Sequence, residues 1–142
     1  MNLPELFTKM PAHVIMRMAP EFPNVKPNSD IDILCQDMNA VITYLNKHLT
    51  LKRFDVTPRH VQLDYDMPGL LKFDLFSFHI SGQFTSDCLR DYQWVNIKDG
   101  WYKVPYKPHE DMLKCYEWIV NKKQKYEGYG KYEELLNEYY RT

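Results

Sequence analysis

Two aspartates spaced two positions apart, Asp30 and Asp32, are the residues of this sequence best suited to chemistry. They follow a turn-like Asn-Ser pair and lead into the apolar residues that end segment 28–35. On a strand, residues two apart project from the same face, and neighbouring carboxylates repel each other unless a cation lies between them. The spacing therefore predicts a Mg²⁺ site, in which carboxylates and substrate phosphates hold the ion. The alternative interpretation is that the two acids merely begin a strand.

A hairpin is expected between two strand-like segments, 60–66 and 71–80. Between them, Pro68-Gly69 suits the central positions of a type II turn. With these two residues as the loop, Leu63 pairs with Asp74. Cross-strand partners share a face of the sheet, so this register places Asp74 on a largely apolar face.

Asp74 is therefore the candidate for a third acid. A carboxylate isolated on an apolar face is costly unless it is neutralised, paired or bound to a metal ion. Asp64 is expected on the other face of the hairpin, and a one-residue slip of the register would make it the third ligand instead. The alternative interpretation of Asp74 is an acid at the edge of the sheet that reaches water.

These motifs resemble those of the nucleotidyltransferase superfamily that includes DNA polymerase β. In that family a Ser-Asp-x-Asp motif lies on a strand, a helix follows it, and a third acid lies on another strand. The matching runs here are NSDIDIL at 28–34 and KFDLF at 72–76. The run MRMAPEFPNVKPNSDIDIL at 16–34 is also similar to small uncharacterised bacterial and viral nucleotidyltransferase-like proteins. The resemblance covers about residues 13–80.

The resemblance implies a small α/β palm with a mixed sheet and a metal-dependent transfer reaction. A nucleoside triphosphate would donate its nucleoside monophosphate to a hydroxyl of a small molecule, a protein or an RNA. Asp30 and Asp32 would hold two Mg²⁺ (or Mn²⁺) ions, while Asp74 would bind the catalytic ion and help deprotonate the acceptor. A pair of metal ions stabilises both the attacking and the leaving oxygen in such reactions.

One element of the family is replaced in this chain. Where the family has Gly-Ser, whose backbone amides and hydroxyl hold the triphosphate, the sequence reads Met18-Ala19-Pro20. Arg17 is expected to take over the phosphate contact, because a guanidinium pairs well with phosphate oxygens. Lys26 and Ser29 are expected to help it. A surface salt bridge is the alternative interpretation of Arg17.

The hydrophobic pattern predicts the elements that position these residues. Apolar residues spaced three and four apart predict an amphipathic helix. This helix is expected over 36–49, between strands at 13–18 and 30–35 and the hairpin. The remaining expected elements are a first helix over 3–10, an irregular proline-rich loop over 20–27, a mixed region over 81–104 with a short helix near 86–92 and a strand-like WYKVP, and helices over 108–121 and 132–139. The predicted class is α/β (α+β), with a mixed sheet of about four to five strands.

Length and composition favour one globular domain that spans residues 1–142, with a core at about 11–80 and a helical extension at about 108–142. The 142 residues include 44% hydrophobic and 15% aromatic residues, and the net charge is −1. A strongly basic footprint for duplex DNA is therefore absent. No apolar run is long enough for a bilayer, and no signal-peptide pattern begins the chain. Three widely spaced cysteines indicate reduced thiols and a cytoplasmic protein.

Two further patterns have alternative interpretations. The C-terminal half interleaves aromatic residues with lysines, which suits the stacking of bases along a single nucleic-acid strand or, alternatively, a core stripe beside a solvated face. The histidines lack a metal-binding spacing and are expected to be packed or exposed, although His60 and His79 border the hairpin and so the site.

The favoured hypothesis is a small Mg²⁺-dependent nucleotidyltransferase. The first alternative is a non-catalytic module of the same fold that binds a nucleotide or a partner protein. The second is a glycosyltransferase that uses the Asp-Ile-Asp run as its metal motif, although the chain is short for that fold. Nucleotide binding without turnover would favour the module, whereas turnover of a nucleotide sugar would favour the glycosyltransferase.

Overall fold

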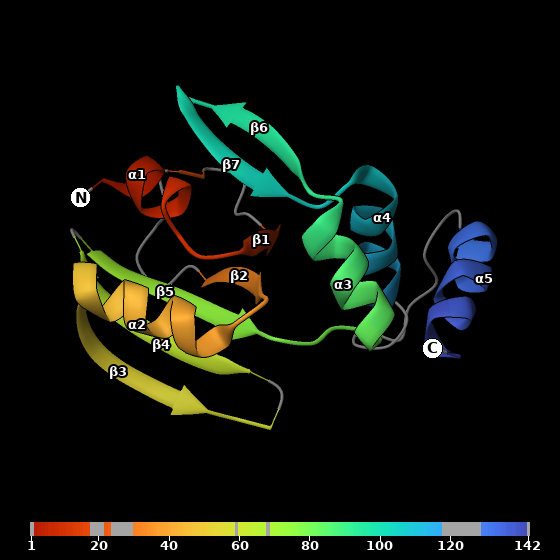
Figure 1. Cartoon of the computed structure of the whole chain (residues 1–142), viewed down its shortest axis with the longest axis horizontal. Helices are drawn as coiled ribbons and strands as arrows, with labels where there is room; N and C mark the ends of the chain where they lie inside the picture. Colours follow the sequence, from red (N-terminus) through yellow and green to blue (C-terminus); the bar gives the residue numbers. More distant parts are fainter. Residues whose placement is uncertain are drawn as a thin grey trace.

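The computed structural model describes residues 2–17, 22–23, 30–58, 60–67, 69–117 and 129–141. These parts of the chain form two sheets and five helices (Figure 1). The larger sheet has five strands in the order β1-β2-β5-β4-β3, and the smaller one consists of β6 and β7. The predicted fold class, a mixed sheet of four to five strands with helices packed on it, is confirmed.

The described elements begin with one helix along the chain and close with two. They are α1 (Leu3–Thr8), β1 (His13–Arg17), β2 (Asp30–Cys35), α2 (Met38–His48), β3 (Thr50–Val56), β4 (Val61–Met67), β5 (Gly69–Phe76), α3 (Gly82–Arg90), β6 (Gln93–Ile97), β7 (Gly100–Val104), α4 (Lys107–Tyr116) and α5 (Tyr129–Tyr140). β2 and β5 are parallel, and every other neighbouring pair in the two sheets is antiparallel.

The centre of the sheet follows the predicted pattern closely. In β2, Ile31 and Ile33 are buried while Asp30 is exposed, as the period-two alternation requires. The helix expected over 36–49 is α2, and Asp37 caps it by accepting a hydrogen bond from the Ala40 amide at 3.1 Å. Val41 and Leu45 of α2 are buried against the sheet.

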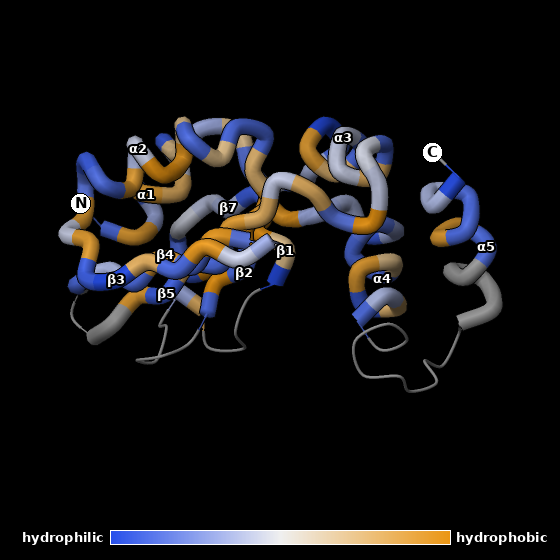
Figure 2. The backbone as a smooth tube through the Cα atoms, turned by 90° about the horizontal axis from the view of Figure 1, so that it is seen from below, coloured by the Kyte–Doolittle hydropathy of each residue, from blue (hydrophilic) through white to orange (hydrophobic). Residues whose placement is uncertain are grey.

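One face of the large sheet is covered except along the edge strand β3, whose Phe54 and Val56 are exposed. Figure 2 shows α1 and α2 on the same side of the strands, and the β6–β7 hairpin closes this layer through Tyr102. The buried side chains of this face are Leu6, Phe7, Ile15, Ile31, Ile33, Leu45, Leu63, Tyr65, Phe73, Leu75 and Tyr102. Burial of this much apolar surface supplies most of the driving force for folding.

The opposite face is divided between an apolar end and a polar end. At the apolar end, Val14 and Leu34 pack against Phe84, Met112 and Leu136, one from each of α3, α4 and α5. These helices form a group beside one end of the strands (Figure 1). At the polar end, the same face carries the charged residues of β2, β4 and β5. None of the helices that the structure describes is long and apolar enough to cross a bilayer.

The outer strand β1 carries a β-bulge. Ile15 pairs with Ile33, but the next pair joins Arg17 to Asp32, so Met16 is an extra residue in β1. In a regular ladder Arg17 would lie one position further along, on the covered apolar face. The bulge instead turns Arg17 toward the face that carries Asp32, which is a common use of bulges near functional sites.

The outer strand β3 was not expected from the sequence. It also carries a bulge, since Leu51 pairs with Tyr65 and Arg53 with Asp64. The extra residue breaks the alternation, so that the apolar residues Leu51 and Phe54 stand three positions apart. Most of the strand is exposed, as is usual at a sheet edge. A search for period-two alternation therefore finds no strand here.

The register of the β4–β5 hairpin differs by one residue from the predicted register. Met67 pairs with Gly69, and Asp74 pairs with Gln62 rather than with Leu63. Asp74 therefore lies on the polar face of the hairpin, and the expectation that it lies on a largely apolar face was wrong. The predicted two-residue loop would pair Met67 with Leu70, whereas the pairing with Gly69 leaves one residue between the strands. The length of the turn decides the register.

The C-terminal half is more regular than the sequence suggested. The short helix expected near 86–92 begins earlier, at Gly82, because the Ser81 hydroxyl accepts a hydrogen bond from the Phe84 amide at 3.0 Å. The strand-like WYKVP belongs to β7, which pairs with the unexpected strand β6. Lys98 and Asp99 between them both have positive φ, as in the tight turns typical of hairpins. The helices expected over 108–121 and 132–139 are α4 and α5, although residues 118–128 lie outside the described part.

Candidate active site

Three aspartates lie together on the polar face of the sheet. Asp30 and Asp32 project from β2, and Asp74 projects from β5. Because these strands are parallel neighbours, Asp32 lies directly opposite Asp74, and Asp30 lies opposite Lys72. The structure therefore brings together the three acids that the sequence singled out, although Asp74 reaches this face through a register that was not predicted.

Burial and mutual repulsion perturb two of the three carboxyl groups. Burial raises the pKa of Asp74 to about 6, and the charges of Asp30 and Asp32 add to the shift. Burial also raises the pKa of Asp32, with Asp30 contributing and Arg17 opposing. A hydrogen bond joins the two groups, and protonated Asp74 donates it to Asp32. Like charges so close together cannot both ionise freely without a cation between them.

His60 lies on the other side of Asp74. Its Nε2 atom is 3.8 Å from Asp74 Oδ1, and its ring stacks on Phe76 with centroids 5.1 Å apart. The Thr57 hydroxyl lies 3.1 Å from His60 Nδ1 and holds the ring in this orientation. The His60 charge favours the ionised form of Asp74 and lowers its pKa. His60 thus borders the site, as expected from its place at the start of the hairpin.

Arg17 bridges two acids at the edge of this cluster. Its Nε atom is 3.1 Å from Asp32 Oδ2, and its Nη2 atom is 3.7 Å from Glu117 Oε2. The Arg17 side chain is 65% exposed, whereas that of Asp32 is 15% exposed. The surface salt bridge considered for Arg17 therefore exists, and it keeps a guanidinium beside the carboxylates with most of its surface open to a ligand. The sequence carried no signal for Glu117, which lies about 100 residues from Arg17 and directly after α4.

A cleft of about 940 Å³ opens beside Arg17 and Asp32. It runs between the end of β1, the loop 77–80, the β6–β7 hairpin and α4. Polar and charged side chains, among them Arg17, Asp32 and Glu117, line one part. The apolar part of the lining includes Ile15, Phe76, Ile80, Val95, Val104 and Leu113. A concave site of this size with few polar groups is typical of a small-molecule site.

His79 forms part of the cleft wall. Its ring packs edge-on against Tyr116, with centroids 4.8 Å apart, and burial lowers its pKa to about 4. Its Nδ1 atom is buried and makes no hydrogen bond to the residues that the structure describes. The imidazole is therefore neutral at pH 7 and offers one donor and one acceptor. His79 borders the site, as expected.

Asp64, the alternative third ligand, has a different partner. It is 3% exposed, and its Oδ2 atom accepts hydrogen bonds from Arg53 Nε at 3.1 Å and Arg53 Nη2 at 3.0 Å. Because Asp64 pairs with Lys72, it lies on the same face as Asp74, not on the opposite face as predicted. The bulge in β3 turns Arg53 toward Asp64, just as the bulge in β1 turns Arg17 toward Asp32.

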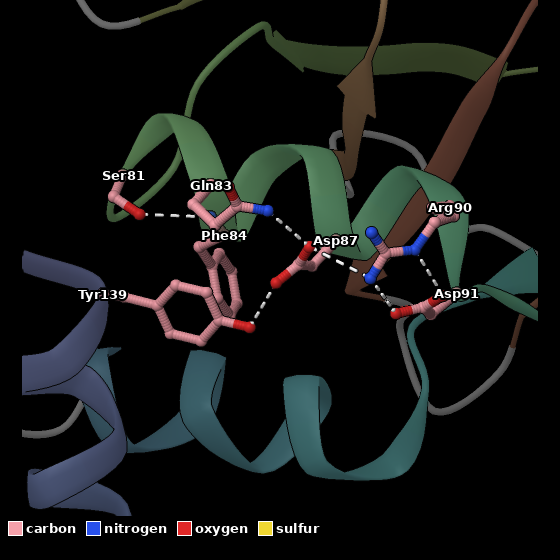
Figure 3. Close-up of polar contacts among 7 residues, drawn as sticks. All are labelled: Ser81, Gln83, Phe84, Asp87, Arg90, Asp91 and Tyr139. Atoms are coloured by element: carbon pink, nitrogen blue, oxygen red, sulfur yellow. Dashed lines mark hydrogen bonds and ion pairs between the residues drawn. The ribbon is translucent and has the colours of Figure 1, made fainter. Parts of the chain in front are cut away.

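Figure 3 shows the polar contacts that tie α5 to α3. The Tyr139 hydroxyl donates to Asp87 Oδ2 at 2.6 Å, and Gln83 Nε2 and Arg90 Nη2 contact Asp87 Oδ1 at 2.8 and 3.0 Å. Burial alone would raise the pKa of Asp87, but these donors outweigh it and lower the pKa. The contacts fix α5, whose Tyr140 contributes to the cleft lining.

Two predicted phosphate contacts remain outside this description. Lys26 and Ser29 both lie outside the described residues, as does the Met18-Ala19-Pro20 segment that stands in place of Gly-Ser. Besides Glu117, two charged residues were not singled out by the sequence: Lys72 between the aspartates and Arg53 on β3. For Lys72, the available signal was its spacing of two from Asp74 on the same strand. The position of Arg53 depends on a bulge, which the sequence did not indicate.

The donor atoms of the cluster suit a hard cation. Asp74 Oδ1 is buried and makes no hydrogen bond to a described residue, and carboxylate oxygens are the ligands that Mg²⁺ prefers. However, within residues 2–17, 22–23, 30–58, 60–67, 69–117 and 129–141, no group of three or more His, Cys, Asp or Glu side chains converges closely enough to hold a metal ion. The arrangement offers the Asp32–Asp74 pair, with Asp30 adjacent.

Comparison of the chain with protein-family models, curated proteins and solved structures found no match.

Proposed function

We propose that this protein is a Mg²⁺-dependent nucleotidyltransferase that moves a nucleoside monophosphate from a nucleoside triphosphate to a hydroxyl group. The observation that carries the proposal is the pairing of Asp32 with Asp74 across the parallel strands, with Asp30 beside them and Arg17 at the mouth of a cleft. Perturbed carboxylates in a concave site are a physical indication of function. The three free, buried cysteines support a cytoplasmic location.

The ion would be held by Asp32 and Asp74, with Asp30 as a further ligand. Two carboxylates are enough for Mg²⁺, which commonly completes its coordination with substrate phosphates and water. When bound, the metal supplies charge stabilisation to the attacking and leaving oxygens of the phosphoryl transfer. Any proton on Asp74 would be lost on binding, because metal ligands must be deprotonated.

Arg17 and the cleft would hold the donor. The guanidinium pairs with triphosphate oxygens, and its exposed surface leaves room for them. The apolar part of the cleft would take the nucleoside, with the rings of His79 and Tyr116 in its wall. Glu117 would position Arg17 through the ion pair between them.

Asp74 would accept the proton of the acceptor hydroxyl. The acceptor oxygen forms a new bond to the α-phosphorus, the bond from the α-phosphorus to the bridging oxygen breaks, and pyrophosphate leaves. The proton passes to Asp74, whose pKa of about 6 in the metal-free protein leaves it mostly ionised at pH 7 before the ion binds. His60 favours that ionised form.

The first test is isothermal titration of each of the four nucleoside triphosphates in the presence of Mg²⁺. We expect Mg²⁺-dependent binding of at least one triphosphate, and its loss in Asp32→Ala. Asp66→Ala is the matched control, because Asp66 is exposed on β4 and pairs only with Lys52, at 3.9 Å, among the ion pairs of the described residues. Absence of binding by every triphosphate would contradict the proposal, and binding of a nucleotide sugar instead would favour a glycosyltransferase.

A second candidate function is a non-catalytic nucleotide-binding module. The observation that favours it is the absence, in the described part of the chain, of three side chains converging on one metal position. Turnover separates the two functions: an α-labelled triphosphate that binds but transfers no label to any hydroxyl acceptor would identify the module.

A further inference from the structure

The edge strand β3 leaves one side of its backbone without a partner strand. It is the last strand in the order β1-β2-β5-β4-β3, and Figure 1 shows no further strand beyond it. The Thr57 amide donates a hydrogen bond to the His60 carbonyl at 2.9 Å, at the turn into β4. Because hydrogen bonding to one neighbour alternates along an antiparallel strand, Asp55 and Arg53 also direct their backbone groups toward β4. The N–H and C=O groups of Phe54 therefore point outward from the sheet.

Two apolar side chains lie exposed on this edge. Phe54 pairs with the buried Leu63 of β4, so Phe54 and Val56 belong to the face of the sheet that α1 and α2 cover. At the edge they lack such cover, because their exposed fractions are 64% and 65%. Exposed apolar residues on an unpaired edge strand form a surface that a further strand can cover.

The polar side of the same edge carries one positive and one negative charge. Arg53 pairs with Asp64, so Arg53 and Asp55 belong to the polar face. Arg53 donates to Asp64 through Nε and Nη2, and Nη1 makes no hydrogen bond to a residue that the structure describes. Asp55 is exposed and has no ion pair within the described ranges. Both residues therefore keep a charged group that a second strand can reach.

We propose that β3 pairs with β3 of a second copy of this chain, in an antiparallel arrangement about a twofold axis at Phe54. Directly opposite residues of an antiparallel pair share a face, so a register that keeps both faces continuous places odd-numbered residues opposite odd-numbered ones. Among such registers, only the one centred on Phe54 places Arg53 opposite Asp55 of the second copy. A register centred on Arg53 or on Asp55 would instead place two like charges opposite each other.

This register uses every exposed feature of the edge. The outward backbone groups of Phe54 form hydrogen bonds with those of Phe54 in the second copy, and the apolar side chains gather on one face. Two Arg53–Asp55 ion pairs form on the other face, where Nη1 is available while Nε and Nη2 hold Asp64. Charges and bulges usually keep an edge from pairing, but here the alternating signs attract one register and repel its neighbours.

The bulge in β3 makes the dimer weak. It lies between Leu51 and Arg53, so the regular stretch available for pairing is confined to residues 53–56. Such a short contact belongs to the small, transient class of protein interfaces, and we expect a Kd of the order of 10⁻⁴ M. The protein is therefore a monomer when dilute and a dimer only when concentrated.

The first test is sedimentation equilibrium of the full chain from about 10 µM to about 1 mM, a range that brackets the expected Kd. We expect a monomer–dimer equilibrium without Mg²⁺ or nucleotide. Asp55→Arg places arginines opposite each other and should weaken association at least about tenfold. The control Glu138→Arg makes the same change of charge at an exposed position of α5, and should associate within about twofold of wild type.

Cross-linking tests the register. Phe54→Cys places two thiols on directly opposed residues, whose Cα atoms lie about 5.5 Å apart. In Val56→Cys the two thiols lie about 14 Å apart, since each is two residues from the axis at a rise of about 3.4 Å per residue. Phe54 and Val56 are equally exposed, and the three native cysteines are buried. With a short bis-maleimide whose span lies between these distances, we expect a covalent dimer from Phe54→Cys and little from Val56→Cys.

Three results would overturn the inference. These are a wild-type protein that stays monomeric up to about 1 mM, association that Asp55→Arg leaves unchanged, and equal cross-linking of Phe54→Cys and Val56→Cys. Neither experiment contains a nucleotide or a metal ion. A failure of the proposed function would therefore leave the dimer to be judged by itself, and the reverse is also true.

Discussion

Asp74 lies opposite Asp32 across the parallel pair of β2 and β5, and the negative charge of Asp32 helps to raise the pKa of Asp74. The pair therefore stores an unfavourable interaction that a cation can relieve. Functional sites often hold groups that would be more stable with other partners. The following predictions use this pair, the arginine beside it and the contacts that fix the cleft wall.

The transfer rate should follow the ionisation of Asp74. Because Asp74 must lose its proton before Mg²⁺ binds, the rate at a Mg²⁺ concentration below saturation should rise as the pH passes through about 6 and level off above it. Asp74→Asn should lower the rate by about 10²- to 10⁴-fold, as for loss of a general base. The measurement is pyrophosphate release between pH 5 and pH 8.5 at saturating triphosphate. A rate for Asp74→Asn close to that of wild type would exclude Asp74 as the base.

The metal-free protein should lose stability as the pH rises from about 4 to above 6. The pKa of Asp74 is raised from 3.8 to about 6 in the folded state, so the folded protein holds more protons than the unfolded chain in that window. Stability falls with pH wherever this is so. Asp74→Asn should therefore gain stability relative to wild type between pH 4 and pH 8, by an amount of the order of 1 kcal/mol because solvent screens a partly exposed group. Urea unfolding at pH 4 and at pH 8 measures the gain in the free energy of unfolding. The control Asp66→Asn should show no such gain.

Arg17→Gln should weaken triphosphate binding. The substitution removes the guanidinium that lies 3.1 Å from Asp32 and faces the cleft. Loss of charge-assisted contacts to phosphate should raise the Kd about ten- to a hundredfold. Titration calorimetry with Mg²⁺ present gives the value, and Lys9→Gln, an exposed cation after α1, is the control. Equal affinities for Arg17→Gln and Lys9→Gln would remove Arg17 from the donor site.

Tyr139→Phe should destabilise the protein through α5. The hydroxyl donates to the charged Asp87 at 2.6 Å, and a hydrogen bond to a charged group contributes about 1.5–3 kcal/mol. Tyr106→Phe removes a hydroxyl that makes no hydrogen bond to a residue in the described part of the chain, and should change the stability by less than about 0.5 kcal/mol. Thermal unfolding at pH 7 compares the two variants. The loss in Tyr139→Phe should fade as the pH falls below 3.8, because the lowered pKa of Asp87 stabilises the fold only while the group is ionised.

The sequence predicted the centre of the fold well because that part obeys simple periodicity. β2 has the predicted bounds, and α2 has the predicted inward residues Val41 and Leu45. The grouping of Asp30 with Asp32 required only that residues two apart share a face of a strand.

The parts of the fold and of the candidate site that the sequence did not predict depended on single-residue details. The turn length at Gly69 decided the face of Asp74, and the bulge in β3 hid a strand by shifting Phe54 out of phase. Glu117 reaches Arg17 only through the tertiary fold. A local pattern specifies neither a bulge nor the docking of a distant helix, because both are decided by packing across the whole sheet.

Both bulges lie in strands that have a neighbour on one side only, β1 and β3. An extra residue there disturbs one hydrogen-bonded ladder rather than two, while β2, β5 and β4 keep their mutual alignment. Insertion or deletion of one residue in β1 or β3 would thus replace the cationic side chain beside Asp32 or Asp64 with another residue. The aspartates themselves would stay in place. The aspartates thus lie on strands of fixed alignment, whereas small changes in the length of the edge strands β1 and β3 could alter ligand preference.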